Sequence, residues 1–167
     1  MHQPGFETAR LVLRPRIRAD LDACVAINSD PEVMRYLGDV WPPERQREHL
    51  SRQIDADLGP GLGYWSLFAK AAPSELLGWV LLSPLPQTEY IQLGYRLRRD
   101  AWGVGLATEA ATEIVAHAFE TLRLTRLAAW VHPENLGSQR VLAKLGFADI
   151  GAYEVGGRAE RLYRRLA

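Results

Sequence analysis

The stretch Trp102-Gly103-Val104-Gly105-Leu106-Ala107 joins two strongly patterned segments, and its position decides the fold. The residues from Glu89 to Leu97 before it are typical of a strand. The residues from Leu106 to Leu122 after it predict a long helix, because apolar side chains recur there at helical spacing: Ala107, Ala111, Ile114, Val115, Ala118, Phe119 and Leu122. The glycines allow a sharp turn between them. The sequence therefore predicts a glycine-rich turn from a strand into a helix.

Such a turn is suited to binding an anion. The first turn of a helix has unpaired N–H donors and the positive end of the helix dipole, and glycines let a ligand approach the backbone closely. A strand-to-helix turn without a ligand is the alternative interpretation. The motif is not a P-loop, and it lacks a full dinucleotide fingerprint because Thr108 stands where the third glycine would fall. No doubly wound βαβ run follows it.

The rest of the chain predicts short strands and helices around this turn. Strands are expected at 10–18, 64–70, 75–82, 89–97, 126–131, 147–155 and 158–166, and helices at 20–28, 42–58, 106–122 and 135–145. Asp20 is the expected N-cap of the first helix, and Gly156-Gly157 predicts a tight final hairpin. The order βααβββαβαββ describes an α/β (α+β) fold, with a mixed, mostly antiparallel sheet of about seven strands and helices on both faces.

Length and composition favour a single globular domain over residues 1–167. Of these 167 residues, 47% are hydrophobic and 24% are charged, and 20 basic side chains balance 20 acidic ones. This balance argues against nucleic acid or a membrane as a partner, and no apolar run approaches the ~18 residues of a membrane span. A start without a secretory signal and the single Cys24 predict a cytoplasmic protein. The few His and Cys residues lack ligand spacing, so no metal is expected.

Four blocks of sequence together resemble a known family. They are Glu7-Thr8-Ala9-Arg10-Leu11-Val12-Leu13-Arg14, Gln92-Leu93-Gly94-Tyr95-Arg96-Leu97 leading into Trp102 to Ala110, Val131-His132-Pro133-Glu134-Asn135-Leu136-Gly137-Ser138, and Val141-Leu142-Ala143-Lys144-Leu145-Gly146-Phe147. In order and spacing they closely resemble the GCN5-related N-acetyltransferases (GNAT), and most of all the Rim-type branch that acetylates ribosomal-protein N-termini. The resemblance extends from Glu7 to the last strand. It implies transfer of an acetyl group from acetyl-CoA to an amine.

The resemblance also implies which residues bind acetyl-CoA. The family binds the pyrophosphate with the backbone at the start of the long helix, which corresponds to Gly103, Val104, Gly105, Leu106, Ala107 and Thr108. It places Leu93, Gly94 and Tyr95 beside the thioester, and Asn135 matches the family's asparagine. The general motif begins with Gln or Arg, whereas this chain has Trp102. Phosphate binding is therefore expected to depend on backbone N–H groups, with Arg98 or Arg99 as helpers.

The catalytic groups are less well defined. An amine must be neutral to attack, and a carboxylate or a water chain would suffice as base. Gln92 stands where the family often has a glutamate, and it is expected to contact the substrate instead. Glu89 is the nearest acid on the same strand and is our candidate base, with Glu154 and Glu160 of the last hairpin as alternatives. Ser138 replaces the family's tyrosine as the candidate acid, and helix capping with Asn135 is its alternative role.

The acceptor is the least defined part of this prediction. Trp41 precedes Pro42-Pro43 in a region that forms part of the family's acceptor site, so we expect it to bind the substrate. The resemblance implies an acceptor that is a protein N-terminus or a small-molecule amine, and it implies a homodimer. A module that binds acyl-CoA without turnover, as a sensor or regulatory subunit, is the alternative function, because the usual glutamate is missing.

Overall fold

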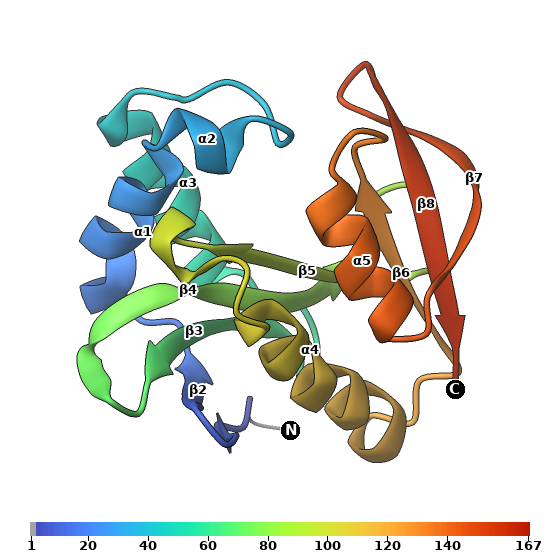
Figure 1. Cartoon of the computed structure of the whole chain (residues 1–167), viewed down its shortest axis with the longest axis horizontal. Coiled ribbons are helices and arrows are strands. Elements are labelled where there is room, and N and C mark those ends of the chain that lie inside the picture. Colours follow the sequence, from blue (N-terminus) through green and yellow to red (C-terminus); the bar gives the residue numbers. More distant parts are fainter. Residues whose placement is uncertain (1–2) are drawn as a thin grey trace.

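The architecture is a single eight-stranded sheet with helices on both faces (Figure 1). A computed structural model describes residues 3–167. The strand order is β1-β2-β3-β4-β5-β6-β8-β7. The strands are β1 (Phe6–Glu7), β2 (Leu11–Pro15), β3 (Gly63–Ala69), β4 (Ala72–Pro84), β5 (Ile91–Leu97), β6 (Arg126–Val131), β7 (Ala148–Val155) and β8 (Arg158–Leu166). The helices are α1 (Leu21–Asn28), α2 (Pro31–Met34), α3 (Pro43–Asp55), α4 (Leu106–Ala116) and α5 (Leu136–Lys144). None of these helices combines the length and the apolar character that crossing a membrane would require.

The predicted class and element order are confirmed, with corrections at the edges. The sheet has one strand more than the approximate number predicted, because the two-residue strand β1 is too short to show an alternating pattern. The four-residue helix α2 is also additional. The long helix ends at Ala116 and continues as a π-helical turn, His117–Thr121. The hairpin between β3 and β4 turns before Ala72, where β4 begins. Residues 72–74, which were predicted to lie in the turn between the two strands, therefore belong to β4.

The sheet splits between β5 and β6, and we call the line along which these two strands separate the divide. Every other neighbouring pair is antiparallel, whereas β5 and β6 are parallel and share one register pair, Gln92 with Ala128. Beyond that pair the strands lead to different helices, β5 to α4 and β6 to α5. In Figure 1, α5 and β6–β8 lie on one side of the molecule, and α1–α3 lie on the other. The two strands therefore diverge toward their carboxyl ends.

The two faces of the sheet are covered by separate apolar clusters. One cluster packs α4 and α5 against the sheet, and it includes Ile114, Leu142, Leu93 and Leu97. The other packs α1 and α3 against the opposite face, and it includes Trp79. Side chains alternate along a strand, so Leu93, Tyr95 and Leu97 of β5 face α4. Gln92, Gly94 and Arg96 therefore belong to the opposite face, which we call the α1/α3 face.

Asp20 precedes α1, as predicted, but its side chain does not cap that helix. Its carboxylate accepts hydrogen bonds from both terminal nitrogens of Arg14, at 2.7 and 2.8 Å, from the Ile17 N–H and from the Ser66 hydroxyl. Burial alone would raise the pKa of Asp20, but these hydrogen bonds outweigh burial and lower it. The carboxylate thus joins β2 and β3 to the start of α1.

Replacing Asp20 with Asn should destabilise the protein at neutral pH and much less in acid. Hydrogen bonds to a charged group contribute about 1.5–3 kcal/mol, so we expect a loss of about 2 kcal/mol, or about 4–8 °C in Tm. Because the folded-state pKa lies below the unfolded value of about 3.9, this contribution is present above that pH. It disappears as the pH falls through the lowered pKa. Denaturant unfolding of both proteins at pH 7 and near pH 3 tests this, and a pH-independent difference would contradict it.

Candidate functional site

The predicted glycine turn has a backbone that glycine permits. Gly103 and Gly105 have φ angles of 76° and 84°, in the left-handed region. A Cβ at Gly103 would meet nothing within 4 Å, and one at Gly105 would meet only Arg10 Nη2, at 3.5 Å. Gly105 is the N-cap of α4 and provides no capping side chain, and the Glu109 N–H donates to the Gly105 carbonyl at 3.0 Å. The N–H groups that precede Glu109 in the first turn remain as donors: Leu106, Ala107 and Thr108.

Arg10 fixes this turn from the side of β2. Its Nη1 donates to the Val104 carbonyl at 2.8 Å, and its Nε and backbone N–H donate to Glu109 at 2.7 and 2.8 Å. Thr8 also donates to Glu109. Burial would raise the pKa of Glu109, but the hydrogen bonds from Thr8 and Arg10 lower it, so the carboxylate stays ionised. Arg10 lies in the block Glu7 to Arg14, but no local pattern there predicts its contact with the turn.

The side chains flanking the turn have partners of their own. Trp102 is 45% exposed, and its Nε1 donates to the Leu97 carbonyl at 2.9 Å. Arg98, a predicted helper, is paired with Asp100 and Glu75, at 2.6 and 3.4 Å. Arg99, the other helper, lies 3.7 Å from Asp30. Neither guanidinium has a hydrogen bond to the turn among the described residues, so an anion there would depend on backbone donors.

Tyr95 and Ser138 meet across the gap between the diverging strands. The Tyr95 hydroxyl donates to the Ser138 carbonyl at 3.1 Å, and the Ser138 N–H donates to Asn135 Oδ1 at 3.1 Å. Asn135 therefore caps α5, as predicted. Both contacts of Ser138 use its main chain, so neither occupies its hydroxyl. Burial raises the pKa of Tyr95 to about 12 and keeps its phenol protonated.

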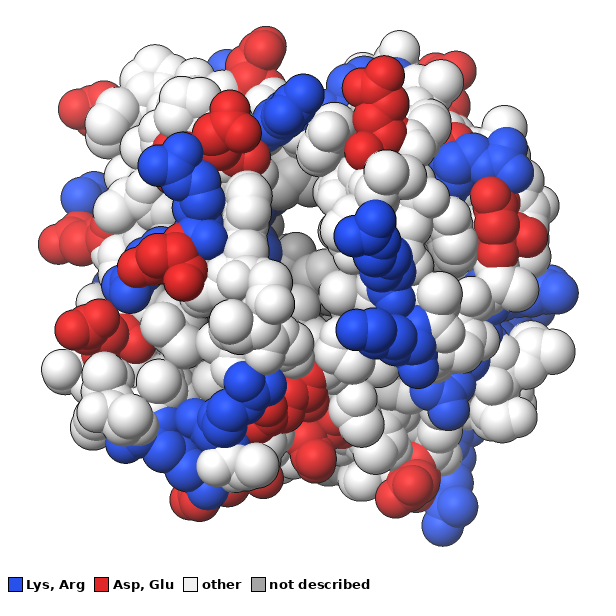
Figure 2. All heavy atoms as spheres, in the orientation of Figure 1, with Lys and Arg blue, Asp and Glu red and all other residues white. Residues whose placement is uncertain are grey.

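A hollow lies between the two halves of the molecule (Figure 2). Figure 2 shows the surface deeply hollowed near the centre of the view, at the position between α2 and α5 in Figure 1. Leu93 is buried in the core, so its main chain is the part that can face a ligand here. A Cβ added at Gly94 would lie 3.1 Å from the side chain of Leu81, so this side chain of β4 packs closely over Gly94. The glycine turn at the N-terminus of α4 and the hollow thus lie along the same divide.

Gln92 braces the point where the strands begin to separate. Its Nε2 donates to the Ser83 hydroxyl at 3.1 Å, and its Oε1 accepts from Trp130 Nε1 at 3.0 Å. These bonds tie β5 to β4 and β6 and occupy both ends of the amide. The predicted contact of Gln92 with the substrate stays a prediction, and the contacts observed here are structural.

Glu89 and Glu160, which sequence analysis considered as bases, have very different surroundings. Glu89 lies in the loop before β5 with its side chain 87% exposed, and it is paired with Arg126 at 2.7 Å. This placement does not favour it as a base. Glu160 of β8 is 1% exposed, and its Oε1 accepts from Arg158 Nη2 at 2.8 Å. Its Oε2 is buried and has no hydrogen-bond partner within residues 3–167. The third candidate, Glu154, is exposed on β7.

A segment after α2 connects the two halves of the molecule above Glu160. The ring of Tyr36 stacks on His132, at the end of β6, with centroids 5.1 Å apart. Arg158 Nη2 donates to the Tyr36 carbonyl at 3.5 Å, and Arg158 also lies close to Gly38. Glu160 therefore lies under a strap, residues 36–38, that reaches from α2 to β6 and β8. No local pattern in the sequence indicated this contact.

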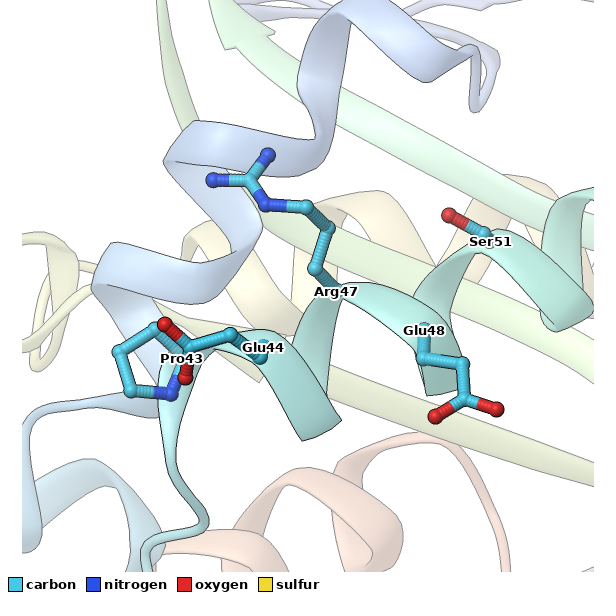
Figure 3. A pocket seen from close by; sticks show the side chains of 5 residues that line it. All are labelled: Pro43, Glu44, Arg47, Glu48 and Ser51. Carbon is cyan, nitrogen blue, oxygen red and sulfur yellow. The ribbon is translucent and has the colours of Figure 1, made fainter.

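Trp41 lies between this strap and α3. Its ring packs edge-on against His49 with centroids 5.4 Å apart, and its carbonyl accepts from Gln46 Nε2 at 2.7 Å. Gln46 and His49 belong to the side of α3 that faces the sheet. The outer side of α3 has a shallow depression, which Figure 3 shows, lined by Pro43, Glu44, Arg47, Glu48 and Ser51. It contains no predicted site residue.

Comparison with known proteins decides the family. Residues 10–148 match the family model described as an acetyltransferase (GNAT) domain, which is most of the chain. The chain belongs to the GNAT acetyltransferase family. It is 32% identical over 162 residues to the FsC-acetyl coenzyme A-N(2)-transacetylase of Aspergillus fumigatus, a match that covers 90% of this chain and 68% of that protein. This GNAT chain is therefore an N-acetyltransferase, as the resemblance implied.

Solved structures of GNAT proteins share the fold. An acetyltransferase from Agrobacterium tumefaciens superposes with a TM-score of 0.87 at 24% identity, covering 100% of this chain and 96% of that one. RimL, described as a ribosomal L7/L12 alpha-N-protein acetyltransferase in complex with coenzyme A, superposes with a TM-score of 0.80 at 16% identity, and the match covers 98% of both chains. At these identities the likeness shows the fold.

The glycine turn of this GNAT chain fits the cosubstrate that the family uses, acetyl-CoA. A pyrophosphate needs several N–H donors and an open approach, and the α4 N-terminus offers both. Gly103 and Gly105 leave open the space that a Cβ would enter. The residues that would hold the pyrophosphate are those predicted: Gly103, Val104, Gly105, Leu106, Ala107 and Thr108.

Proposed function

We propose that this protein transfers the acetyl group of acetyl-CoA to a primary amine, which enters from the α1/α3 face. The observation that carries this proposal is the uncapped N-terminus of α4, with its donors at the divide between β5 and β6. Leu93, Gly94 and Tyr95 lie on β5 along this divide. Their backbone is suited to hold the thioester part of the cosubstrate, and Asn135 and Ser138 approach from the other side.

The chain's own groups can handle the proton that moves in this reaction. Acetyl-CoA supplies the acetyl group as a thioester: a C–N bond to the amine forms, the C–S bond breaks, and one proton passes from the amine to the sulfur overall. Ser138 is suited to donate to the sulfur because its main chain is fixed by Asn135 and Tyr95 while its hydroxyl is not engaged by them. Glu160 Oε2, buried and unpaired, is suited to accept the proton of the amine.

The acceptor is a small-molecule amine or a protein N-terminal α-amine, and the strap favours the first. Residues 36–38 connect α2 to β6 and β8 through Tyr36, His132 and Arg158. A strap in this position restricts the approach to the α1/α3 face, so a small amine enters more easily than a folded ribosomal protein. The related FsC transacetylase of Aspergillus fumigatus is named for transfer to an N(2) position, which is consistent with a small acceptor.

Thermal unfolding with acetyl-CoA, free CoA and ATP tests the proposed cosubstrate. A ligand at ~100 times its Kd adds about 2.7 kcal/mol of stability, which raises Tm by several degrees in a domain of this size. We expect this shift with acetyl-CoA and with CoA, and little shift with ATP. Thiol release in the presence of small amines or N-terminal peptides then measures turnover. An unchanged Tm at saturating acetyl-CoA would refute the assignment of the turn, and binding without any turnover would favour the sensor alternative.

A further inference from the structure

Two arginines lie together on the α1/α3 face. Arg16 follows β2 and is 6% exposed, and Arg96 of β5 is half-buried. Both guanidinium groups lie against the ring of Trp79, at 4.6 and 5.2 Å from its centroid. The Arg16 guanidinium also lies 4.6 Å from the ring of Tyr64. Two positive charges therefore share one space lined by aromatic rings.

Neither guanidinium is paired with a carboxylate of the described chain. Arg16 Nη1 donates to Gln53 Oε1 at 3.1 Å, and Arg96 Nη1 donates to Asn28 Oδ1. Both acceptors are neutral amides. Asp20 is the acid whose charge acts on Arg16, but its oxygens are taken by Arg14, the Ile17 N–H and Ser66. Salt bridges within residues 3–167 include neither arginine.

The guanidinium nitrogens that have no partner form a fork of hydrogen-bond donors. Arg16 Nε and Nη2 and Arg96 Nε are buried and have no hydrogen-bond partner within the described residues. Nε and Nη2 are on the same edge of a guanidinium, and this edge binds both oxygens of a carboxylate at once. Leaving such donors unpaired in the interior costs free energy, and two uncompensated charges cost more. An anion that pairs with these donors would therefore stabilise the arrangement further, beyond the contacts with the rings of Trp79 and Tyr64.

The electrostatics agree with this geometry. Burial lowers the pKa of Arg16, and burial followed by repulsion from Arg16 lowers the pKa of Arg96 to about 10. Both groups still carry their charge at neutral pH. An anion between them would offset the burial and the mutual repulsion of these two charges.

The arginine pair lies next to the proposed reaction site. Arg96 is two residues beyond Gly94 on the same face of β5, which places their Cα atoms about 6.6 Å apart. On the other side, Gln53 links Arg16 to His49, with its Nε2 3.0 Å from the His49 ring nitrogen, and Trp41 packs on His49. A ligand held by the pair would therefore lie between β5 and the wall formed by Trp41 and His49.

Resting on the proposed function, we infer that Arg16 and Arg96 form a carboxylate-binding subsite of the acceptor pocket. The acceptor is then a small amine that carries a carboxylate several ångströms from its nitrogen. The Arg16 edge binds the two carboxylate oxygens, and Arg96 provides a further donor through Nε. This selects amino-carboxylates over neutral amines, because a neutral analogue would leave the buried donors unpaired.

Matched acceptors test this inference directly. Straight-chain ω-amino acids with two to five methylenes and the corresponding ω-amino carboxamides are compared by kcat/KM. In the wild type we expect the best acid to exceed its amide by at least about tenfold. In Arg16→Met and Arg96→Met this ratio should fall toward one. Arg47→Met is the matched control, because Arg47 lies on the outer face of α3 paired with Asp22, and it should keep the wild-type ratio.

Stability measurements distinguish this role from a structural one. Met keeps most of the contact with Trp79 and removes an uncompensated charge, so both Met variants should have a Tm at least equal to that of the wild type. If either variant unfolds, Arg16→Lys keeps the charge and loses the fork, and it should still reduce the ratio of acid to amide. If the Met variants have a lower Tm and the wild-type ratio of kcat/KM for acid and amide, the arginines stabilise the fold and do not bind the acceptor.

Binding without turnover separates this inference from the proposed function. The N-acetylated ω-amino acids should raise the Tm of the wild type and leave the Tm of Arg16→Met unchanged. The corresponding amides should leave the Tm of both proteins unchanged. The wild type could bind acetyl-CoA and acetylate amines with equal kcat/KM for acid and amide. This result would overturn the carboxylate subsite and leave the proposed function standing. Stabilisation by inorganic phosphate alone, with that ratio at one, would also overturn it. No shift with acetyl-CoA and no turnover would refute the proposed function itself.

Discussion

Gly105→Val should reduce the affinity for acetyl-CoA by more than about 100-fold. The φ angle of Gly105 is 84°, where a β-branched residue is strongly disfavoured, so the turn must change its path. The N–H groups at the start of α4 would then no longer converge on the pyrophosphate. Losing two hydrogen bonds to a charged group, at about 1.5–3 kcal/mol each, accounts for this factor. Isothermal titration with acetyl-CoA measures it.

The control variant has the same unfavourable backbone conformation at a position outside the glycine turn. Gly157→Val places valine at a φ angle of 77° in the turn between β7 and β8, where a Cβ also meets nothing within 4 Å. We expect it to lose a similar amount of stability, of about 1–3 kcal/mol, and to keep its affinity for acetyl-CoA. Equal affinities of the wild type and Gly105→Val would show that the turn has only a structural role.

Glu160→Gln should lower kcat by about 100-fold or more, with little change in the Kd for acetyl-CoA. A positioned general base contributes roughly 10²–10⁴ in rate, and the amide cannot accept the proton of the amine. The size of the side chain and an acceptor for Arg158 Nη2 are retained, so the fold should persist. The measurement is kcat against pH for both proteins, together with titration of acetyl-CoA. The acidic limb of the wild-type profile should be absent in the variant.

Two comparisons make this result specific. Glu89→Gln removes the other carboxylate, which lies exposed beside Arg126, and it should leave kcat and the pH profile close to those of the wild type. Ser138→Ala should lower kcat through the leaving thiolate and keep the acidic limb. If Glu89→Gln abolishes the acidic limb and Glu160→Gln does not, the two carboxylates have been assigned the wrong way round.

The acceptor pocket connects these groups. Glu160 and Arg96 belong to β8 and β5, on opposite sides of the divide, and the strap, Trp41 and His49 border the α1/α3 face. A carboxylate bound by Arg16 and Arg96 would place the amine of a small acceptor between β5 and Glu160. Acceptor length should therefore have an optimum in the ω-amino acid series.

Local sequence patterns were sufficient for most of the framework. The glycine turn, the apolar face of α4 and the cap of α5 at Asn135 are each produced by residues close together in the chain, and the structure has them as predicted. Backbone preference and hydrogen bonds over a few residues decide such features. The edge strand β1 was missed because two residues carry no periodicity, and its pairing with β2 alone defines it.

Contacts between distant residues decided the rest of the site. Proximity to Gln92 in the sequence made Glu89 the candidate base, yet only the pairing of β6 with β8 and the strap at Tyr36 show that Glu160 is the buried one of the candidate carboxylates. Arg16 and Arg96 are 80 residues apart, and no pattern in the sequence pairs them. Burial and the absence of a partner charge depend on which elements pack together, and no local pattern contains that information. The sequence by itself determined the glycine turn at the start of α4, whereas the tertiary structure decided which charged side chains are buried and which of their atoms lack a partner.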